Sequence, residues 1–358
     1  DMLSAYSALN QGHNHPKIAN VLKRQIETLT LTSRAFHNDK MGPFLKKLTD
    51  YTGFDKALPM NTGAEAVETA LKTTRRWGYK VKNVPDNQAE IIVCQDNFHG
   101  RTTTICGFST DPLCREGFGP FTPGFKVIPF GDSEALEDAI TSNTVAFLVE
   151  PIQGEAGVKI PPIGYLKECR EITKRQNVLL ITDEIQTGLG RTGKLFCYEH
   201  DGIKPDMVTI GKALGGGFYP VSAVLASSEL MDTAFQPGNH GSTFGGNPLG
   251  SAVAAAAMDV IIDEELVKRS EEMGAYFREK LQEMNSPLVQ EIRGKGLLIA
   301  IDLTESAGKA RQYTEAMMRA GVLAKETHET IIRFAPPLVI TKEEIDWAME
   351  KIKSVLVK

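Results

Sequence analysis

The chain has 358 residues, of which 42% are hydrophobic and 24% are charged, and its formal net charge is -5 at pH 7. This length favours about two domains, and the mildly acidic balance argues against nucleic acid or an anionic membrane surface as a partner. No segment reaches ~18 uninterrupted apolar residues, so the sequence predicts no transmembrane helix.

Cysteine and histidine usage predicts neither a disulfide framework nor a metal site. The odd number of cysteines and the absence of a CxxC pair favour a reducing compartment such as the cytoplasm. His13 and His15 have no carboxylate or further histidine at helical spacing, so we interpret them as loop residues. The chain begins at Asp1 and not at Met, which leaves an upstream targeting sequence open.

Short runs rich in Val, Ile and Leu alternate with helical patterns through the first 263 residues, which is typical of a mostly parallel sheet in an α/β protein. The predicted strands are residues 90–94, 126–130, 145–150, 178–184 and 207–211, and the predicted helices are 64–79, 165–175 and 248–262. Beyond residue 263, amphipathic helices alternate with short strands, which predicts a smaller α+β domain. Its helices are 264–284, 309–320 and 342–356, and its strands are 296–303 and 331–334.

Polar and aromatic residues follow several of these strands. Ligands of open parallel sheets bind beyond the carboxyl ends of the strands, where loops bring polar groups together. The strand exits carry the sequences NFHGR, PIQGE and DEIQTG, and the last strand is followed by a lysine. We therefore expect Phe98, Arg101, Glu155, Asp183 and Lys212 to converge on one place.

Lys212 and Asp183 are the candidate catalytic residues. A lysine at a buried strand end has a lowered pKa and can form a Schiff base, although such a lysine is more often a snorkelling residue. A carboxylate that closes a buried strand needs a cation or strong donors. A protonated pyridine nitrogen is such a partner for Asp183, and a turn or capping role is the alternative.

The segment NTGAEAVETALK offers a seat for a phosphate. Thr62 and Glu65 have the spacing of a capping box, and Gly63 lets an anion approach the free N–H groups at the helix start. A well-capped helix without a ligand explains the same residues. The segment GSTFGGNP, residues 241–248, offers hydroxyl groups that could bind phosphate or form a turn.

The segment GLGRTGK, residues 188–194, matches two nucleotide-binding patterns only superficially. The dinucleotide fingerprint should follow its strand directly, whereas 183–187 intervene here, and Leu195 stands where the P-loop needs Ser or Thr. We therefore expect no nucleotide at this segment.

Taken together, the motifs NTGAEAVETALK, NFHGRT, VEPIQGEAG, ITDEIQTGLGRTG, GKALGGGFYPVSAV and GSTFGGNP resemble those of the class III (omega-amino acid) aminotransferases. The resemblance covers essentially the whole chain. It implies the fold-type-I architecture, with a mostly parallel seven-stranded sheet, and pyridoxal 5'-phosphate (PLP) as the cofactor. It also implies a remnant of an N-terminal segment at 1–10, a large PLP-binding domain at 11–263 and a small C-terminal domain at 264–358.

By this resemblance, Lys212 forms the Schiff base with PLP and shuttles the proton, and Asp183 pairs with the pyridinium nitrogen. Gln186 lies near the ring hydroxyl, and Phe98 stacks on the ring, although an aromatic residue at a strand end is more often part of the core. His99, which follows Phe98, receives no role.

The resemblance also implies how the phosphate is held. Gly63 and Ala64 provide backbone N–H groups, and Ser242 and Thr243 complete the phosphate site of the neighbouring subunit. The active form is accordingly expected to be a homodimer with active sites at the subunit interface.

The segments YSALNQGHNHPKI, LTLTSRAFHN, RGKGLL and IIRFAPPLVI are most similar to the family members that transfer the δ-amino group of L-ornithine to 2-oxoglutarate, a reaction of arginine and proline metabolism. By resemblance, Arg333 binds the near carboxylate of glutamate or 2-oxoglutarate, and Glu155 pairs with Arg333 when ornithine is bound. Arg101 takes the distal carboxylate, and Tyr6 lines the ornithine pocket.

Three alternatives remain at this stage. Acetylornithine and 4-aminobutyrate aminotransferases share the cofactor chemistry but differ in the substrate pocket. A nicotinamide-dependent dehydrogenase would need residues 188–193 to hold a dinucleotide, and a non-catalytic binding protein would not depend on Lys212.

Overall fold

Seven strands form the larger of two sheets in the computed structural model, which describes residues 1–357. Their order is β1-β7-β6-β5-β4-β2-β3, and β7 runs antiparallel to both of its neighbours while the other pairs are parallel. The strands are β1 (Lys56–Met60), β2 (Glu90–Cys94), β3 (Phe125–Ile128), β4 (Thr144–Val149), β5 (Leu179–Asp183), β6 (Met207–Ile210) and β7 (Ser222–Ala226). The expected mostly parallel, seven-stranded sheet is confirmed.

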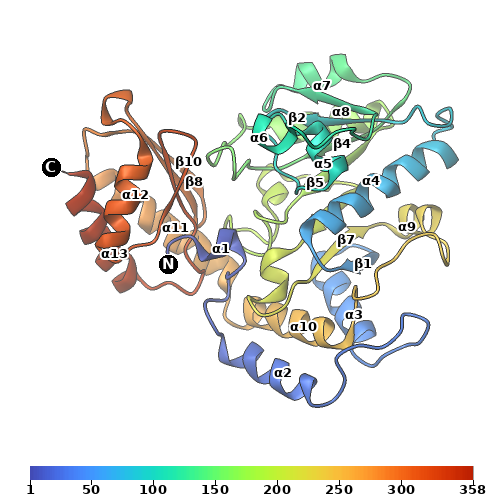
Figure 1. Cartoon of the computed structure of the whole chain (residues 1–358), viewed down its shortest axis with the longest axis horizontal. Helices are drawn as coiled ribbons and strands as arrows, with labels where there is room; N and C mark the ends of the chain where they lie inside the picture. The colour runs from blue at the N-terminus through green and yellow to red at the C-terminus, as the bar shows by residue number, and fades with distance from the viewer. Residues whose placement is uncertain (358) are drawn as a thin grey trace.

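Helices cover both faces of this sheet (Figure 1). Side chains of β4 alternate between the faces from Ala146 onward: Ala146 and Leu148 pack with α4, whereas Phe147 and Val149 pack in the cluster that contains α8 and α10. The helices of this part are α1 (Ser4–Ser7), α2 (Pro16–Ile26), α3 (Met41–Thr52), α4 (Gly63–Lys80), α5 (Thr103–Phe108), α6 (Pro112–Arg115), α7 (Ser133–Ala139), α8 (Tyr165–Arg175), α9 (Ser228–Ala234) and α10 (Pro248–Asp263), with 3₁₀ turns η1 (Cys197–Asp201) and η2 (Lys212–Gly215). Burial on both faces explains why these strands read as continuous apolar runs.

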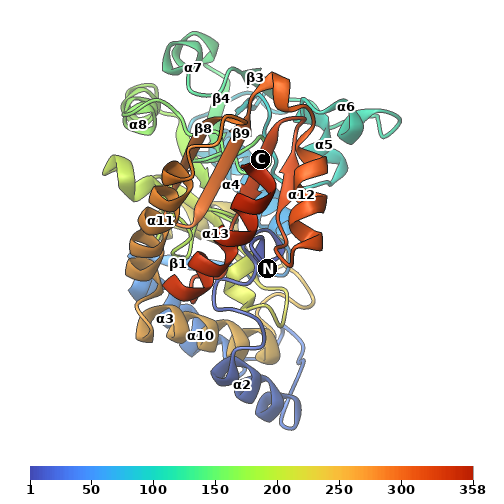
Figure 2. The ribbon, with the colours of Figure 1, turned by 90° about the vertical axis from the view of Figure 1, so that its left-hand side faces the viewer.

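The C-terminal part contains a four-stranded antiparallel sheet of order β10-β11-β9-β8. Figure 2 shows its helices on the side of the sheet that faces away from the large sheet. Alternate residues of β9 serve the two faces: Ile299 and Ile301 pack with the helices, whereas Leu298 and Ala300 pack on Ile152 and Val158 of the large part. The elements are α11 (Leu266–Glu283), β8 (Val289–Lys295), β9 (Leu298–Leu303), η3 (Glu305–Ala307), α12 (Ala310–Arg319), β10 (Lys325–Thr327), β11 (Ile331–Phe334) and α13 (Lys342–Leu356).

Each strand and helix predicted from the sequence is present, and β2, β11, α8 and α13 have the predicted bounds. The strands β1, β7, β8 and β10 were not predicted. KALPM contains a proline and SAVLA is mostly Ala and Ser, while VQEIRGK and KET are rich in polar residues, so none of them signals a strand. The predicted domain boundary lies between α10, which ends at Asp263, and α11, which begins at Leu266, and it stays a prediction.

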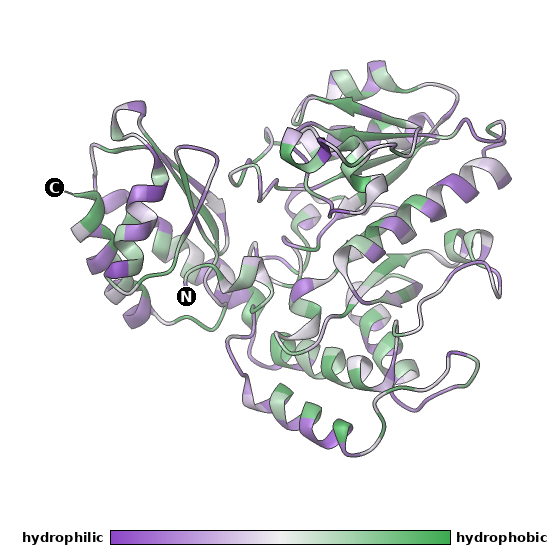
Figure 3. Cartoon of the chain, viewed as in Figure 1, coloured by the Kyte–Doolittle hydropathy of each residue, from purple (hydrophilic) through white to green (hydrophobic). Residues whose placement is uncertain are grey.

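Apolar residues are concentrated inside the two parts, as the hydropathy colouring of Figure 3 shows. Helix α10 is apolar around most of its circumference because it packs against α2, α3, α11 and η2. Within residues 1–357, none of the helices combines the length and apolar character needed to cross a bilayer.

The N-terminal element α1 has an unusual backbone. Four consecutive residues that are not glycine, Ser4, Ala5, Tyr6 and Ser7, have φ values of 45°, 48°, 58° and 70°. This left-handed conformation costs roughly 1–2 kcal/mol for each L-residue. The turn therefore persists only because surrounding contacts hold it.

Candidate active site

A cavity of about 190 Å³ lies beyond the carboxyl ends of β2, β4, β5 and β6. The strand-end rule thus predicted its location correctly. The lining residues are Gly63, Ala64, Phe98, His99, Gly100, Glu150, Ile152, Glu155, Asp183, Ile185, Gln186, Thr187 and Lys212. Among the five residues expected to converge, Arg101 is the exception: it is exposed, with its guanidinium carbon 5.9 Å from the centre of the Phe98 ring.

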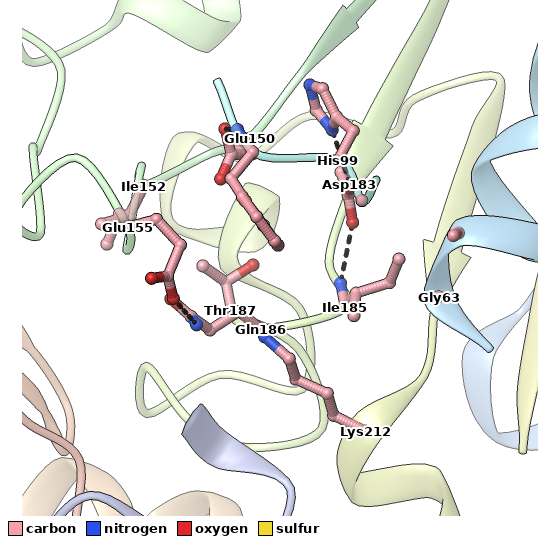
Figure 4. A pocket seen from close by; sticks show the side chains of 13 residues that line it. Gly63, His99, Glu150, Ile152, Glu155, Asp183, Ile185, Gln186, Thr187 and Lys212 are labelled. Atoms are coloured by element: carbon pink, nitrogen blue, oxygen red, sulfur yellow. Dashed lines mark hydrogen bonds and ion pairs between the residues drawn. The ribbon is translucent and has the colours of Figure 1, made fainter. Parts of the chain in front are cut away.

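Lys212 follows β6 and extends its side chain into the cavity (Figure 4). Its φ of 45° is left-handed, a strained conformation that proteins retain mainly where function requires it. Burial lowers the pKa of the Lys212 amine, against the opposing influence of Glu155 and Asp183. A larger fraction of this amine is therefore neutral and nucleophilic than for an exposed lysine.

Asp183 is held by three donors and is almost completely buried. Its Oδ2 lies 2.7 Å from Nδ1 of His99, and its Oδ1 accepts hydrogen bonds from the Ile185 N–H (3.1 Å) and the Thr209 hydroxyl (3.0 Å). Burial opposes the charge of His99, but the hydrogen bond and charge of Asp183, with that of Glu150, raise the pKa of this histidine overall. The arrangement keeps a negative charge and a proton donor at one wall of the cavity.

Glu150 and His99 lie in the site although the sequence interpretation gave neither a role. Glu150 follows β4 directly and accepts the Phe98 N–H at 3.0 Å. Burial raises the pKa of Glu150 to about 8, and the nearby Asp183 charge adds to this shift against His99. Their place at the exits of strands was the signal available. His99 directly follows Phe98, and Glu150 ends a predicted strand.

The N-terminus of α4 has the predicted capping box. The Glu65 N–H donates to Thr62 Oγ1 at 3.2 Å, and the Glu65 carboxylate accepts the Thr62 N–H at 2.7 Å. Among residues 1–357, the Gly63 and Ala64 N–H groups donate no hydrogen bond. A side chain at position 63 would begin 3.0 Å from Ile185 Cδ1. Two free N–H groups at a positive helix end fit an anion.

Ser242 and Thr243 do not line this cavity. Asn61 Nδ2 donates to Ser242 Oγ at 2.8 Å, which places their loop beside the start of α4, and Thr243 is exposed. Their expected role toward a neighbouring subunit stays a prediction.

Glu155 connects the cavity to the small sheet through Arg333 on β11. Arg333 Nη1 donates to Glu155 Oε1 at 2.8 Å and to the Gly154 carbonyl at 2.9 Å, and Gln186 Nε2 donates to the same Glu155 oxygen at 3.1 Å. Burial opposes the Glu155 charge, but Arg333 outweighs it, so the Glu155 pKa is lowered. The Tyr6 ring lies against this pair, 5.1 Å from the guanidinium carbon.

The segment 188–193 forms a buried loop against the small domain. The Leu297 N–H donates to the Arg191 carbonyl at 3.0 Å, and a Cβ on Gly193 would lie 2.0 Å from Glu271 Oε2. The loop is therefore packed closely against the C-terminal part. His13 and His15 contact Asp1 and Glu264, respectively.

Comparison with known proteins identifies the family. The model of the aminotransferase class-III family matches residues 1–356. The chain belongs to this family. An ornithine aminotransferase of Brevibacillus brevis is 63% identical over 356 residues, which is 99% of this chain and 88% of that protein. The crystal structure of ornithine aminotransferase from Toxoplasma gondii superimposes with a TM-score of 0.98 at 47% identity, over 100% of this chain and 86% of that one.

An acetylornithine aminotransferase from Elizabethkingia anophelis is also similar, with a TM-score of 0.89 at 48% identity, over 100% of this chain and 88% of that one. The fold alone therefore does not separate these two activities. The separation must come from the residues around the cavity.

Class III aminotransferases use PLP, and the residues of the cavity fit this cofactor. The free N–H groups of Gly63 and Ala64 suit its phosphate, and the buried Asp183 carboxylate suits its pyridinium nitrogen. Lys212 places an amine in the cavity, which suits its aldehyde. The buried Gln186 Oε1 has no partner among residues 1–357 and is free to accept a bond from a ligand. The protein is a PLP-dependent aminotransferase.

Proposed function

We propose that this protein transfers the δ-amino group of L-ornithine to 2-oxoglutarate, giving L-glutamate 5-semialdehyde and L-glutamate. The observation that carries the proposal is the ion pair between the buried Arg333 and the half-buried Glu155, beside Tyr6 at the edge of the cavity. Identity of more than half to ornithine aminotransferases over nearly the whole chain supports it.

The reaction requires one site to accept two different amine donors. Ornithine presents its terminal amine and keeps its carboxylate far from the reacting carbon, whereas glutamate presents its α-amine with a carboxylate beside it. An arginine free to bind a carboxylate favours glutamate, and an arginine neutralised by Glu155 favours ornithine. The Arg333–Glu155 pair supports the proposal, because it corresponds to the second of these two arrangements.

When bound, PLP supplies an aldehyde that condenses with amines and an electron-withdrawing ring that stabilises negative charge on the adjacent carbon. Asp183 would keep the ring nitrogen protonated, and His99 fixes the orientation of Asp183 through Nδ1. The neutral form of Lys212 can accept the proton from the amine-bearing carbon through Nζ. Phe98 would lie against one face of the ring, and Gln186 near its hydroxyl.

For the second substrate, Arg333 would release Glu155 and bind the near carboxylate, while Arg101 would bind the distal one. Arg101 is available for this role because it is exposed and forms no ion pair within residues 1–357; its guanidinium lies near the Phe98 ring. The planar guanidinium fork matches a carboxylate, which a lysine would not.

We further propose a homodimer, in which Ser242 and Thr243 complete the phosphate site of the second copy. Exposed apolar side chains near their loop support such an interface: Leu31, Phe36 and Phe244 are 36%, 69% and 47% exposed. The five free cysteines support a reducing compartment such as the cytoplasm.

A panel of amine donors tests the function. Ornithine, acetylornithine, 4-aminobutyrate and lysine are each supplied with 2-oxoglutarate, and the cyclised product of glutamate 5-semialdehyde is trapped with o-aminobenzaldehyde. We expect product from ornithine and the highest kcat/KM for it. Higher kcat/KM for acetylornithine would transfer the assignment to that activity.

A further inference from the structure

Arg191 lies at the junction of three parts of the chain and is fully buried. Its Nη1 donates to the carbonyl groups of Leu297 (3.0 Å) and Pro336 (2.6 Å) in the small domain. Its Nη2 donates to Ser4 Oγ (3.2 Å) and Asn10 Oδ1 (2.6 Å) in the N-terminal segment. All four acceptors are neutral, so hydrogen bonds hold the guanidinium and no ion pair is involved in these contacts.

Two of these bonds flank the left-handed turn Ser4–Ser7. Ser4 begins the turn, and its own hydroxyl donates to the Ala335 carbonyl at 2.5 Å. Asn10 follows the turn, and its Nδ2 donates to the Leu189 carbonyl at 3.0 Å. Because L-residues avoid this backbone conformation, the turn depends on these ties at both ends.

The turn places Tyr6 against Arg333. Tyr6 is 39% exposed, so packing alone restrains its ring weakly, and its position follows from the backbone of the turn. Arg191 also binds the carbonyl of Pro336, three residues beyond Arg333 on the segment that leaves β11. One guanidinium therefore restrains both partners of the Tyr6–Arg333 contact.

We propose that Arg191 is a positioning residue for substrate choice: it holds the strained turn that sets Tyr6 over Arg333 and thereby favours ornithine over glutamate as the amine donor. This inference rests on the proposed function. Arg191 does not line the cavity, so it acts through Tyr6 and Arg333 and does not touch the reacting atoms.

The test uses Arg191→Lys, which keeps a cation but loses the fork that reaches both sides, and Ser4→Ala, a milder change. We expect kcat/KM in the ornithine half-reaction to fall about tenfold in Arg191→Lys, mainly through KM, and the glutamate half-reaction to change less than about threefold. Ser4→Ala should shift the ratio in the same direction by a smaller factor.

Arg269→Lys is the matched control. Arg269 Nη2 also donates to two neutral carbonyl groups of the small domain, those of Val339 and Ile340, but has no recorded bond to the N-terminal segment. Its ornithine-to-glutamate ratio should equal that of the wild type.

Two further measurements separate positioning from general loosening. In a Tyr6→Ala background, Arg191→Lys should produce no further change in the ratio, because the residue through which it acts is gone. Amide hydrogen exchange of residues 1–12 should accelerate in Arg191→Lys while the cofactor absorption spectrum is unchanged.

An unchanged ratio in both Arg191→Lys and Ser4→Ala would overturn the proposal, as would an equal effect with and without Tyr6. If the wild-type protein does not use ornithine, the proposed function fails instead. The hydrogen-exchange comparison then still decides whether Arg191 holds the turn.

Discussion

The cavity at the strand ends and the contact group of Tyr6, Glu155 and Arg333 are built in different ways. The cavity takes its polar residues from four strands of one sheet and from the start of α4, so hydrogen-bonded neighbours fix their relative positions. The contact group joins a loop of the large part, the N-terminal turn and β11 of the small sheet. A rigid sheet suits the chemistry common to all substrates, whereas a junction between separate segments can rearrange for each substrate.

The two regions also differ in how their charged groups are held. In the cavity, Asp183 has donors from three residues, and burial raises the pKa of Glu150 to about 8. In the contact group, a single ion pair to Arg333 dominates, and under the proposed function a substrate carboxylate would replace Glu155 in it. Changes in the cavity should therefore affect every substrate, and changes in the contact group should affect the preference among substrates.

The largest effect is expected for Lys212→Ala. Loss of the amine should lower the rate of both half-reactions by about 10³-fold or more, because no other lysine lines the cavity within residues 1–357. Borohydride reduction of the holoprotein followed by peptide mapping should label Lys212 in the wild type. Label at another residue would contradict the assignment.

Asp183→Asn should lower kcat for both donors by about 10²-fold, since it removes the negative charge but keeps the size of the side chain. The pKa of His99 should fall toward its ordinary value because Asp183 is the main group that raises it. Half-reaction rates and the NMR titration of His99 measure the two effects. An equal loss of kcat for ornithine and glutamate is expected for a residue of the cavity, which serves both donors.

Glu155→Ala should separate the two regions. Arg333 would then be free for carboxylates, and the ratio of glutamate to ornithine efficiency should rise about tenfold. Half-reaction kinetics with each donor give this ratio. Arg333→Ala serves as a companion variant and should weaken glutamate use; an unchanged ratio in Glu155→Ala would discard the switch.

The smallest effect concerns stability and Glu150. Burial raises the pKa of Glu150 from 4.5 to about 8, so the folded state holds an extra proton between these two pH values. The free energy of unfolding therefore falls as pH rises from 4.5 to 8 and levels off above 8. Glu150→Gln removes this titration. Its Tm should exceed that of the wild type by roughly 2–4 °C more at pH 9 than at pH 6.

Thermal unfolding of the apo forms at the two pH values measures this difference. The exposed Glu171→Gln on α8 is the matched control and should show the same pH slope as the wild type. If the Tm of Glu150→Gln changed with pH as much as that of the wild type, the buried carboxyl would not titrate in this range.

Most of the sheet and the location of the cavity could be predicted from the sequence alone. Continuous apolar runs marked β2, β4, β5 and β6, and the polar residues directly after them had to meet because the ends of neighbouring parallel strands are adjacent. The capping box at the start of α4 was likewise readable, because its contacts are local. Local periodicity and short spacing carry this information.

The residues that surround this cavity could be recognised only from the three-dimensional structure. His99 and Glu150 gained their importance from burial beside Asp183, and the contact of Tyr6 with Arg333 joins residues from opposite ends of the chain. Arg191 likewise gained its importance only from contacts between distant segments. In the sequence it stood out only as part of the glycine-rich segment 188–194. Contacts between distant segments depend on how the two sheets pack, and no spacing along the chain encodes that packing.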